Sequence, residues 1–489
     1  MKSQSFGLII AAILVGALSV PSVPAEPIHL HMGRHLFVDD FLIDRSEHFE
    51  KTLHHPEKIG RAIRGGMETP DRNNQPYATI LRDEETGKFR MWYNTRDSAE
   101  DEVFLSYTES EDGIVWDQPF EKLLFLRGFG CCVIDRGDEE NDPAKRFRLI
   151  YWGTSGEAVK YYKDPGASIR VAFSPDGIEW TPYENNPVLR GLWEHSILGD
   201  PQGVGSIEWR RAAQDIIQAV WDPTRQRYLA LVKTWTWPPD ELGEISPTSS
   251  GMGRRLSSWL ASPDFIHWST PERAFVPDDQ DPALLEFYSC RPKVRGNQLI
   301  NLSCILNEGV GSGIGYTVVA TSNDGGETWD RMREPWLDRT AWHPEAIDHA
   351  VAWVSDLVTV GDRDYIYYGC YNVGHKTFSD RTLSMAFQRK DGFISRDALG
   401  PEPGTLITPE VTFDSNDLFV NAKVYGQLNL RFVDSDGAPL PGFDWNDIPP
   451  IQGDSVEHLV KLPAPLPGGQ AFHIEFRLKY GELYGFELR

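Results

Sequence analysis

The stretch Ser322-Asn-Asp-Gly-Gly-Glu-Thr-Trp329 decides the fold that we predict, because looser copies of it recur along the chain. In each copy, a Ser or Asp side chain can hold a tight turn through hydrogen bonds to nearby backbone, and the aromatic ring can pack between sheets. The copies are Ser110-Glu-Asp-Gly-Ile-Val-Trp116, Ser174-Pro-Asp-Gly-Ile-Glu-Trp180, Ser262-Pro-Asp-Phe-Ile-His-Trp268 and a shortened Lys390-Asp-Gly-Phe393. Their rings follow one another at 64, 88, 61 and 64 residues, which indicates a repeated structural unit.

Short apolar strands precede each of these boxes. In the first repeat they are predicted at residues 77–81, 89–93 and 103–107. Repeats of three or four antiparallel strands predict an all-β fold, a five-bladed β-propeller over residues 26–397. We expect the segment 36–58 to donate the outer strand of the fifth blade. Residues 398–489 lack the box but alternate strands with turns, which predicts a small C-terminal β-sandwich.

Residues 1–25 have the features of a secretory signal, with Lys2, an apolar run over 8–20 and Val23-Pro-Ala25 before the expected cleavage point. The run is shorter than the ~20 residues of a membrane span. We therefore expect a secreted or periplasmic protein with no membrane span. The net charge of −24 argues against nucleic acid as a partner. The five Cys include no Cys-x-x-Cys pair and allow at most one buried disulfide, and no sequence feature sets an oligomeric state.

Acidic residues stand where the first strand of several repeats begins. In a propeller these strand starts converge on one mouth of the central channel. Hydrolysis of a glycosidic bond needs one protonated and one ionised carboxyl group, whose pKa values burial and mutual repulsion can separate. We therefore assign Glu286 as the general acid, Asp215 as the base or nucleophile, and Asp348 as an orienting or stabilising group.

Other side chains near the same strand starts are candidates for binding sugar. Acids at the first repeat and polar or aromatic groups beside the catalytic candidates could contact hydroxyl groups or stack on a ring; they are Glu68, Asp71, Arg291, His349 and Trp235. Each also has a plain structural interpretation, as an ion pair, a core hydrogen bond or ordinary packing. No metal site or cofactor is predicted, and a structural Ca²⁺ in the channel has no supporting loop pattern.

A secretory signal, a five-bladed propeller with Ser-x-Asp-Gly-x-x-Trp boxes and a C-terminal β-sandwich together resemble secreted bacterial proteins related to glycoside hydrolase families 32, 43 and 68. The resemblance extends over residues 36–489. It implies a carbohydrate substrate and three carboxylates on the innermost strands: two Asp and one Glu. The sequence lacks the Asn-Asp-Pro-Asn-Gly, Arg-Asp-Pro and Glu-Cys signatures of these families.

Three functions are compatible with this pattern. The first is a secreted glycoside hydrolase that cleaves a polysaccharide or oligosaccharide by carboxylate catalysis. The second is a sialidase-like exo-glycosidase, because Ser322–Trp329 matches the sialidase box, although nothing marks the Arg trio that such an enzyme needs. The third is a propeller that binds glycan without cleaving it.

Overall fold

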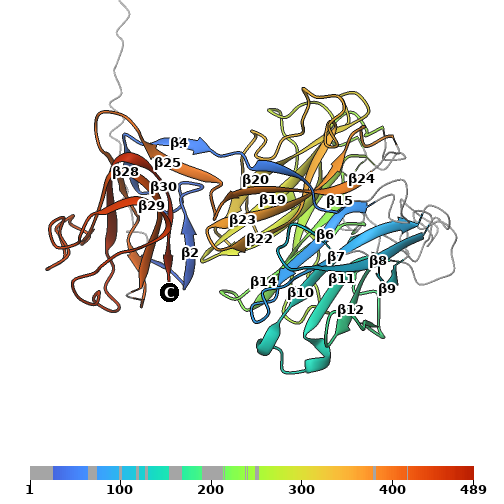
Figure 1. Cartoon of the computed structure of the whole chain (residues 1–489), viewed down its shortest axis with the longest axis horizontal. Coiled ribbons are helices and arrows are strands. Elements are labelled where there is room, and N and C mark those ends of the chain that lie inside the picture. Colours follow the sequence, from blue (N-terminus) through green and yellow to red (C-terminus); the bar gives the residue numbers. More distant parts are fainter. Residues whose placement is uncertain are drawn as a thin grey trace, which may run out of the picture.

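The structure is a computed structural model that describes residues 26–63, 74–97, 102–116, 121–126, 130–153, 168–189, 213, 215–236, 238, 240–247, 253–377, 381–415 and 417–489. Over these ranges strands dominate, and the helical elements are the 3-10 turns η1 (Gly137–Glu139) and η2 (Pro143–Lys145). None of the described helical turns is long and apolar enough to cross a membrane. The strands form two lobes, a propeller and a β-sandwich (Figure 1). The all-β prediction is confirmed.

Five antiparallel four-stranded units build the propeller, and we number them blades 1 to 5 in the order of their first strands. Three of the units are separate sheets, and the last two are joined into one eight-stranded sheet by a parallel bridge between Gly315 and Val351. Blade 1 contains β6 (Asn74–Arg82), β7 (Phe89–Asp97), β8 (Glu102–Ser110) and β9 (Glu121–Leu126). Blade 2 contains β10 (Cys132–Asp135), β11 (Phe147–Gly153), β12 (Ser168–Ser174) and β13 (Thr181–Pro182). Blade 3 contains β14 (Ile217–Asp222), β15 (Arg227–Trp235), β16 (Arg255–Ser262) and β17 (Glu272–Phe275). Blade 4 contains β18 (Leu285–Arg295), β19 (Gln298–Asn307), β20 (Ile314–Ser322) and β21 (Asp330–Arg331).

Blade 5 is completed by a strand from the other end of the chain. It contains β22 (Val351–Val360), β23 (Arg363–Tyr371), β24 (Arg381–Arg389) and β5 (Glu57–Arg61). β5 pairs antiparallel with β24, with Phe387 opposite Glu57. The outer strand therefore comes from the N-terminal part of the chain, as expected, but only its first two residues, Glu57 and Lys58, lie within the expected segment 36–58.

The first strands of the blades contact one another in a closed ring. β6 lies beside β10, β10 beside β14, β14 beside β18, β18 beside β22, and β22 beside β6. Each of these strands has neighbours on both faces, so most of their side chains are buried. The buried residues include charged ones, Glu286 and Arg291 on β18 and Asp356 on β22, and these need partners inside the ring.

An ion cluster crosses the ring near its centre, and we call it the axial ion cluster. The fully buried carboxylate of Asp356 on β22 accepts hydrogen bonds from Arg291 Nε at 2.8 Å and Lys293 Nζ at 2.6 Å, both on β18. Although burial opposes it, these cations hold the pKa of Asp356 below its usual value. The other three blades also contribute contacts. From blade 1, the N–H of Ile80 donates to Asp356 at 2.8 Å. From blades 2 and 3, Cys132 and Gln218 accept hydrogen bonds from Arg291.

The repeated boxes are turns, as predicted, and each is held by the preceding blade. Within the box of blade 1, the carboxylate of Asp112 accepts the backbone N–H groups of residues 114 and 115 at 2.8 Å. Hydrogen bonds then run between blades to the five boxes: Tyr367 to the Gly113 carbonyl, Trp92 to Gly177, Arg148 to Asp264, Arg227 to Gly325 and Arg295 to the Asp391 carboxylate. The box therefore fixes both the turn and the blade interface.

The C-terminal lobe contains more of the chain than residues 398–489. Its strands are β25 (Ile394–Ala398), β26 (Gly404–Ile407), β27 (Val411–Thr412), β28 (Leu418–Val433), β29 (Ile451–Leu459) and β30 (His473–Leu488). The N-terminal strands β1 (Ile28–His29), β2 (Gly33–Leu36), β3 (Arg45–Glu47) and β4 (Glu50–Leu53) pair with β27, β30, β26 and β25. The segment before β5 thus belongs to the sandwich and not to the propeller, because it completes the sheet around the two long strands β28 and β30.

Removing the central carboxylate should destabilise the whole propeller. In Asp356→Asn, Arg291 and Lys293 stay buried or half-buried without a counter-charge, and we expect a loss of about 3–5 kcal/mol in the free energy of unfolding. Urea unfolding followed by tryptophan fluorescence measures this. The exposed Asp279→Asn is the matched control and should change the same free energy by less than about 0.5 kcal/mol. An Asp356→Asn chain as stable as the control would contradict the importance of the cluster.

The buried His35 should make stability depend on acid. Its ring stacks on Phe486, and burial lowers its pKa from 6.5 to about 4. In the unfolded chain this imidazole is protonated below about pH 6.5, whereas in the folded chain it is protonated only below about pH 4. The free energy of unfolding therefore falls as the pH drops from about 6.5 to about 4. Unfolding measured at pH 7 and at pH 4.5 should show this loss, and His35→Gln should reduce it. An unchanged pH dependence in the variant would refute the assignment.

Candidate functional site

The starts of four inner strands meet in one cluster of polar and aromatic side chains, which we call the strand-start cluster. Tyr77 on β6 hydrogen-bonds Tyr288 on β18, and the ring of Tyr288 stacks on Trp353 of β22 with centroids 4.4 Å apart. Asp215, which precedes β14, acts electrostatically on both tyrosines. The structure therefore brings together the strand starts of blades 1, 3, 4 and 5, as a propeller requires.

Asp215 is the part-exposed acid of this cluster. Its side chain is 21% exposed and forms an ion pair with the Nζ of Lys233 on the adjacent strand β15. Lys233 is itself buried, and burial lowers its pKa while Asp215 opposes that shift. The Nζ also lies 4.6 Å from the centroid of the Tyr288 ring. Asp215 is thus held in a fixed orientation, and solvent or a ligand can reach it.

Glu286 lies in the same cluster but is fully buried. One carboxylate oxygen accepts the backbone N–H of Arg255 at 2.8 Å, and the other accepts its Nη1 at 2.6 Å. Both carboxylate oxygens are therefore occupied by donors of one arginine. The predicted general acid must instead carry a proton and reach the leaving oxygen. In this arrangement Glu286 positions Arg255, whose guanidinium lies 5.3 Å from the Tyr288 ring centroid.

A hydrogen-bonded chain continues from Tyr288 to a buried carboxylate. His375 Nε2 lies 3.1 Å from the Tyr288 hydroxyl, and His375 Nδ1 lies 3.0 Å from Oε1 of Glu308. Burial, with Arg255 and Arg381 nearby, lowers the pKa of His375 to about 4, against the effect of Glu308. A neutral His375 that donates a hydrogen bond through Nδ1 can accept a hydrogen bond from the Tyr288 hydroxyl at Nε2. Burial and Asp215 raise the pKa of Tyr288, so its hydroxyl stays protonated.

Cationic groups surround the same tyrosine. Lys233 and Arg255 lie over its ring, and Arg381 on β24 lies 4.3 Å from the ring centroid of Tyr371 beside it. The cluster therefore offers one accessible carboxylate, protonated tyrosine hydroxyls and fixed positive charge. These are the groups that bind sugar hydroxyls and that stabilise charge changes at a reacting carbon or oxygen.

Asp348 does not join this cluster. It is buried at the blade 5 side and pairs with Lys58 of the outer strand β5 at 2.6 Å, and it accepts a hydrogen bond from Tyr368 at 3.4 Å. His349 Nδ1 lies 3.4 Å from the carbonyl oxygen of Thr340 in the preceding loop. Among the described residues, Asp348 shares no hydrogen-bond or ion-pair partner with Asp215 or Glu286. Its contacts attach the outer strand to the blade.

The remaining predicted binding residues lie in different places. Arg291 belongs to the axial ion cluster and is 5% exposed. Trp235 is buried, with the Arg255 guanidinium 5.0 Å from its ring centroid, so it packs inside the cluster. Glu68 and Asp71 lie outside the described residues.

Several cluster members were not predicted from sequence: Tyr77, Lys233, Arg255, Tyr288, Glu308 and His375. Strand alternation alone does not place Tyr288, because it lies at an irregularity in the pairing of β18 between Phe287 and Ser289. His375 and Glu308 come from loops between strands, where no periodicity applies. The described part of the chain contains no group of three acidic, His or Cys side chains placed to hold a metal ion. All five Cys are buried free thiols.

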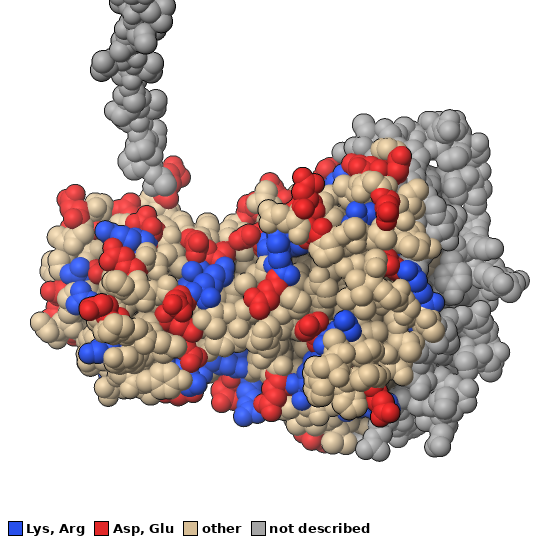
Figure 2. Space-filling model, turned by 90° about the horizontal axis from the view of Figure 1, so that it is seen from above, with Lys and Arg blue, Asp and Glu red and all other residues tan. Residues whose placement is uncertain are grey.

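Positive and negative side chains are intermixed over the face shown in Figure 2. No single-sign patch covers the described part of that face. This distribution gives no support to a nucleic-acid surface, which would gather Lys and Arg on one side.

No family model and no curated protein matches the chain. Among solved structures, a protein described as a glycoside hydrolase is similar at 14% identity and a TM-score of 0.48, over 68% of this chain and 92% of that one. A complex of BT0996 with RGII is similar at 15% identity and a TM-score of 0.47, over 69% and 93%. The Bombyx mori GH32 β-fructofuranosidase BmSUC1 is similar at 11% identity and a TM-score of 0.40, over 86% and 95%.

Neutralising Glu286 should lower stability. In Glu286→Gln the buried guanidinium of Arg255 loses its counter-charge, and we expect a loss of about 3–5 kcal/mol in the free energy of unfolding. Urea unfolding checks this, with the exposed Glu402→Gln as the matched control. If both variants unfold at the same urea concentration as the original chain, Glu286 does not hold the cluster together.

Proposed function

We propose that this chain is a secreted glycoside hydrolase that acts on an oligosaccharide or polysaccharide at the strand-start cluster. The observation that carries the proposal is the environment of Asp215. It is a part-exposed carboxylate, oriented by Lys233, at a point where four inner strands present hydroxyl, aromatic and cationic groups. The leader-like segment 1–25 supports export.

The chemistry assigned to Asp215 follows from its charge. Lys233 orients the carboxylate, which in its ionised form can attack an anomeric carbon or take a proton from water. Tyr288 and Tyr77 stay protonated, and because the Tyr288 proton is directed at His375, the Tyr288 oxygen can accept a hydrogen bond from a sugar hydroxyl. Lys233 and Arg255 can stabilise negative charge that develops on a leaving oxygen. Each of these contacts contributes most when it is stronger in the transition state than with bound substrate.

A proton donor to the leaving group is the second requirement of the mechanism. Glu286 can fill this role only if substrate binding draws Arg255 away and a proton takes its place. The dependence on leaving group tests this. If Glu286 is the acid, Glu286→Gln should cleave aryl glycosides with acidic phenol leaving groups almost normally and natural linkages poorly. If Glu286 only positions Arg255, both substrate types should lose rate equally.

A second function is favoured by a specific observation. Of the three acids predicted to be catalytic, Glu286 and Asp348 are both buried and ion-paired, and Asp215 alone is accessible. Hydrolysis of a glycosidic bond normally uses two carboxyl groups. A propeller in which only one of these three predicted acids is accessible could instead bind glycan without cleaving it. The positive charges of Arg255 and Arg381 near Tyr288 could attract acidic sugars. A substrate panel should therefore include acidic sugars such as sialosides.

Asp215→Asn should separate these functions. For a hydrolase, we expect the release of reducing sugar across a glycan panel to fall by about 10²–10⁴-fold in kcat/KM, because the amide cannot act as a nucleophile or base. Binding of the same glycan, measured by calorimetry, should persist. The exposed Asp279→Asn is the matched control and should keep full activity. Original chain that binds a glycan but releases no sugar would favour the binding function, and undiminished activity in Asp215→Asn would exclude this carboxylate from the mechanism.

A further inference from the structure

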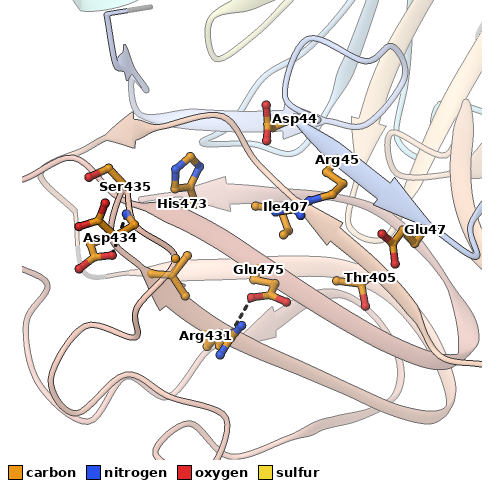
Figure 3. Close-up of a pocket in the computed structure, with 13 residues that line it drawn as sticks. Asp44, Arg45, Glu47, Thr405, Ile407, Arg431, Asp434, Ser435, His473 and Glu475 are labelled. Carbon is orange, nitrogen blue, oxygen red and sulfur yellow. Dashed lines mark hydrogen bonds and ion pairs between the residues drawn. The ribbon is translucent and has the colours of Figure 1, made fainter. Parts of the chain in front are cut away.

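A polar recess of about 610 Å³ lies on the sandwich lobe, and we call it the outer recess. Four strands, β3, β26, β30 and β28, form its floor, and the turn 434–437 forms one wall (Figure 3). Its size falls within the range of small-molecule sites. Nothing in the strand-start cluster contributes to it.

Strand register explains why this face is polar. Across the sheet, Arg45 stands opposite Ile407, Ile407 opposite Glu475, and Glu475 opposite Arg431. Because side chains alternate along a strand, their neighbours Leu406, Ile474 and Leu430 point the other way into the sandwich core. The recess is thus the outer face of the same sheet whose inner face packs the core.

The floor of the recess is held in place. Glu475 is 5% exposed, and its Oε2 accepts a hydrogen bond from Arg431 Nε at 2.6 Å (Figure 3). The guanidinium groups of Arg431 and Arg477 lie 4.6 and 4.2 Å from the ring centroid of Trp445. In the wall, Asp434 accepts backbone N–H groups of its own turn at 2.9 and 3.0 Å. A ligand would therefore meet groups that are already oriented, which lowers the entropic cost of binding.

The charges of the lining select the class of ligand. It contains the carboxylates of Asp44, Glu47, Asp434, Asp436 and Glu475 but only two guanidinium groups, those of Arg45 and Arg431. This excess of negative charge disfavours an anion. In the described part of the chain no three of these acids are close enough to share a metal ion. The apolar lining is limited to Ile407 and Val433, which disfavours a hydrophobic ligand.

We propose that the outer recess is a second saccharide-binding site, specific for uncharged sugars and separate from the strand-start cluster. Carboxylate oxygens accept hydrogen bonds from sugar hydroxyls, while Arg45, Ser435 and Thr405 donate hydrogen bonds to their oxygens. The site holds the protein on a neutral polysaccharide, and it does not depend on whether the strand-start cluster cleaves sugar.

Affinity electrophoresis of the full chain tests this, in native gels that contain neutral arabinan, galactan, xylan or laminarin, with polygalacturonate as the anionic comparison. We expect at least one neutral polysaccharide to retard the chain more than polygalacturonate does. Thr405→Trp fills the recess without changing charge and should abolish that retardation, whereas Thr181→Trp on the exposed strand β13 should leave it intact. Glu47→Gln, at an exposed position, should weaken it by about tenfold, the factor that one lost charged hydrogen bond represents.

Asp215→Asn should not affect retardation through the outer recess. Failure of the recess proposal can therefore be distinguished from failure of the hydrolase proposal. Thermal unfolding confirms that the Thr405→Trp chain is folded, and Glu47→Gln carries the test if it is not. The proposal is overturned if none of the four neutral polysaccharides retards the chain, if polygalacturonate retards it more strongly, or if the recess variants are retarded as strongly as the original chain.

Discussion

The ion pair between Arg291 and Asp356 is the constraint on which the propeller depends. A buried carboxylate is costly unless hydrogen-bond donors surround it. Besides the N–H of its neighbour Leu357, Asp356 accepts hydrogen bonds from Arg291 and Lys293 of β18 and from the Ile80 N–H of β6. Arg291 in turn contacts Gln218 and Cys132 of the two remaining inner strands. A ring with a blade missing or displaced would leave charge unpaired at its centre, so the cluster favours one closed arrangement.

The repeated boxes impose the same closure at the periphery. Each of the four full boxes is a turn held by its own Asp, and each receives a hydrogen bond from the blade before it. In the first four blades this hydrogen bond goes to a backbone carbonyl. In the last blade it is replaced by the ion pair of Arg295 with the Asp391 carboxylate. That carboxylate also binds Arg34 of the N-terminal segment, so the final box joins the propeller to the sandwich. The rigid ring then fixes the strand starts that carry Asp215, Glu286 and Tyr288.

The sequence predicted the all-β class because its period-two strands and repeated boxes are local signals. It also predicted that acids would gather at strand starts, and Asp215 and Glu286 do lie in one cluster. It could not predict that Glu286 is paired, because Arg255 lies 31 residues away on another strand and only packing brings the two together. The ion pair of Asp348 could not be predicted for the same reason, since its partner Lys58 comes from the N-terminal part of the chain. The strands β1 to β4 show their alternation in sequence but not their long-range partners in the sandwich.

The claim that the strand-start cluster is where glycan binds is tested most directly by a crystal structure of the Asp215→Asn chain soaked with an oligosaccharide that the original chain binds. We predict electron density for a sugar ring within hydrogen-bond distance of residue 215 and the Tyr288 hydroxyl. A crystal in which the oligosaccharide occupies another surface, with the cluster closed to it, would contradict this account.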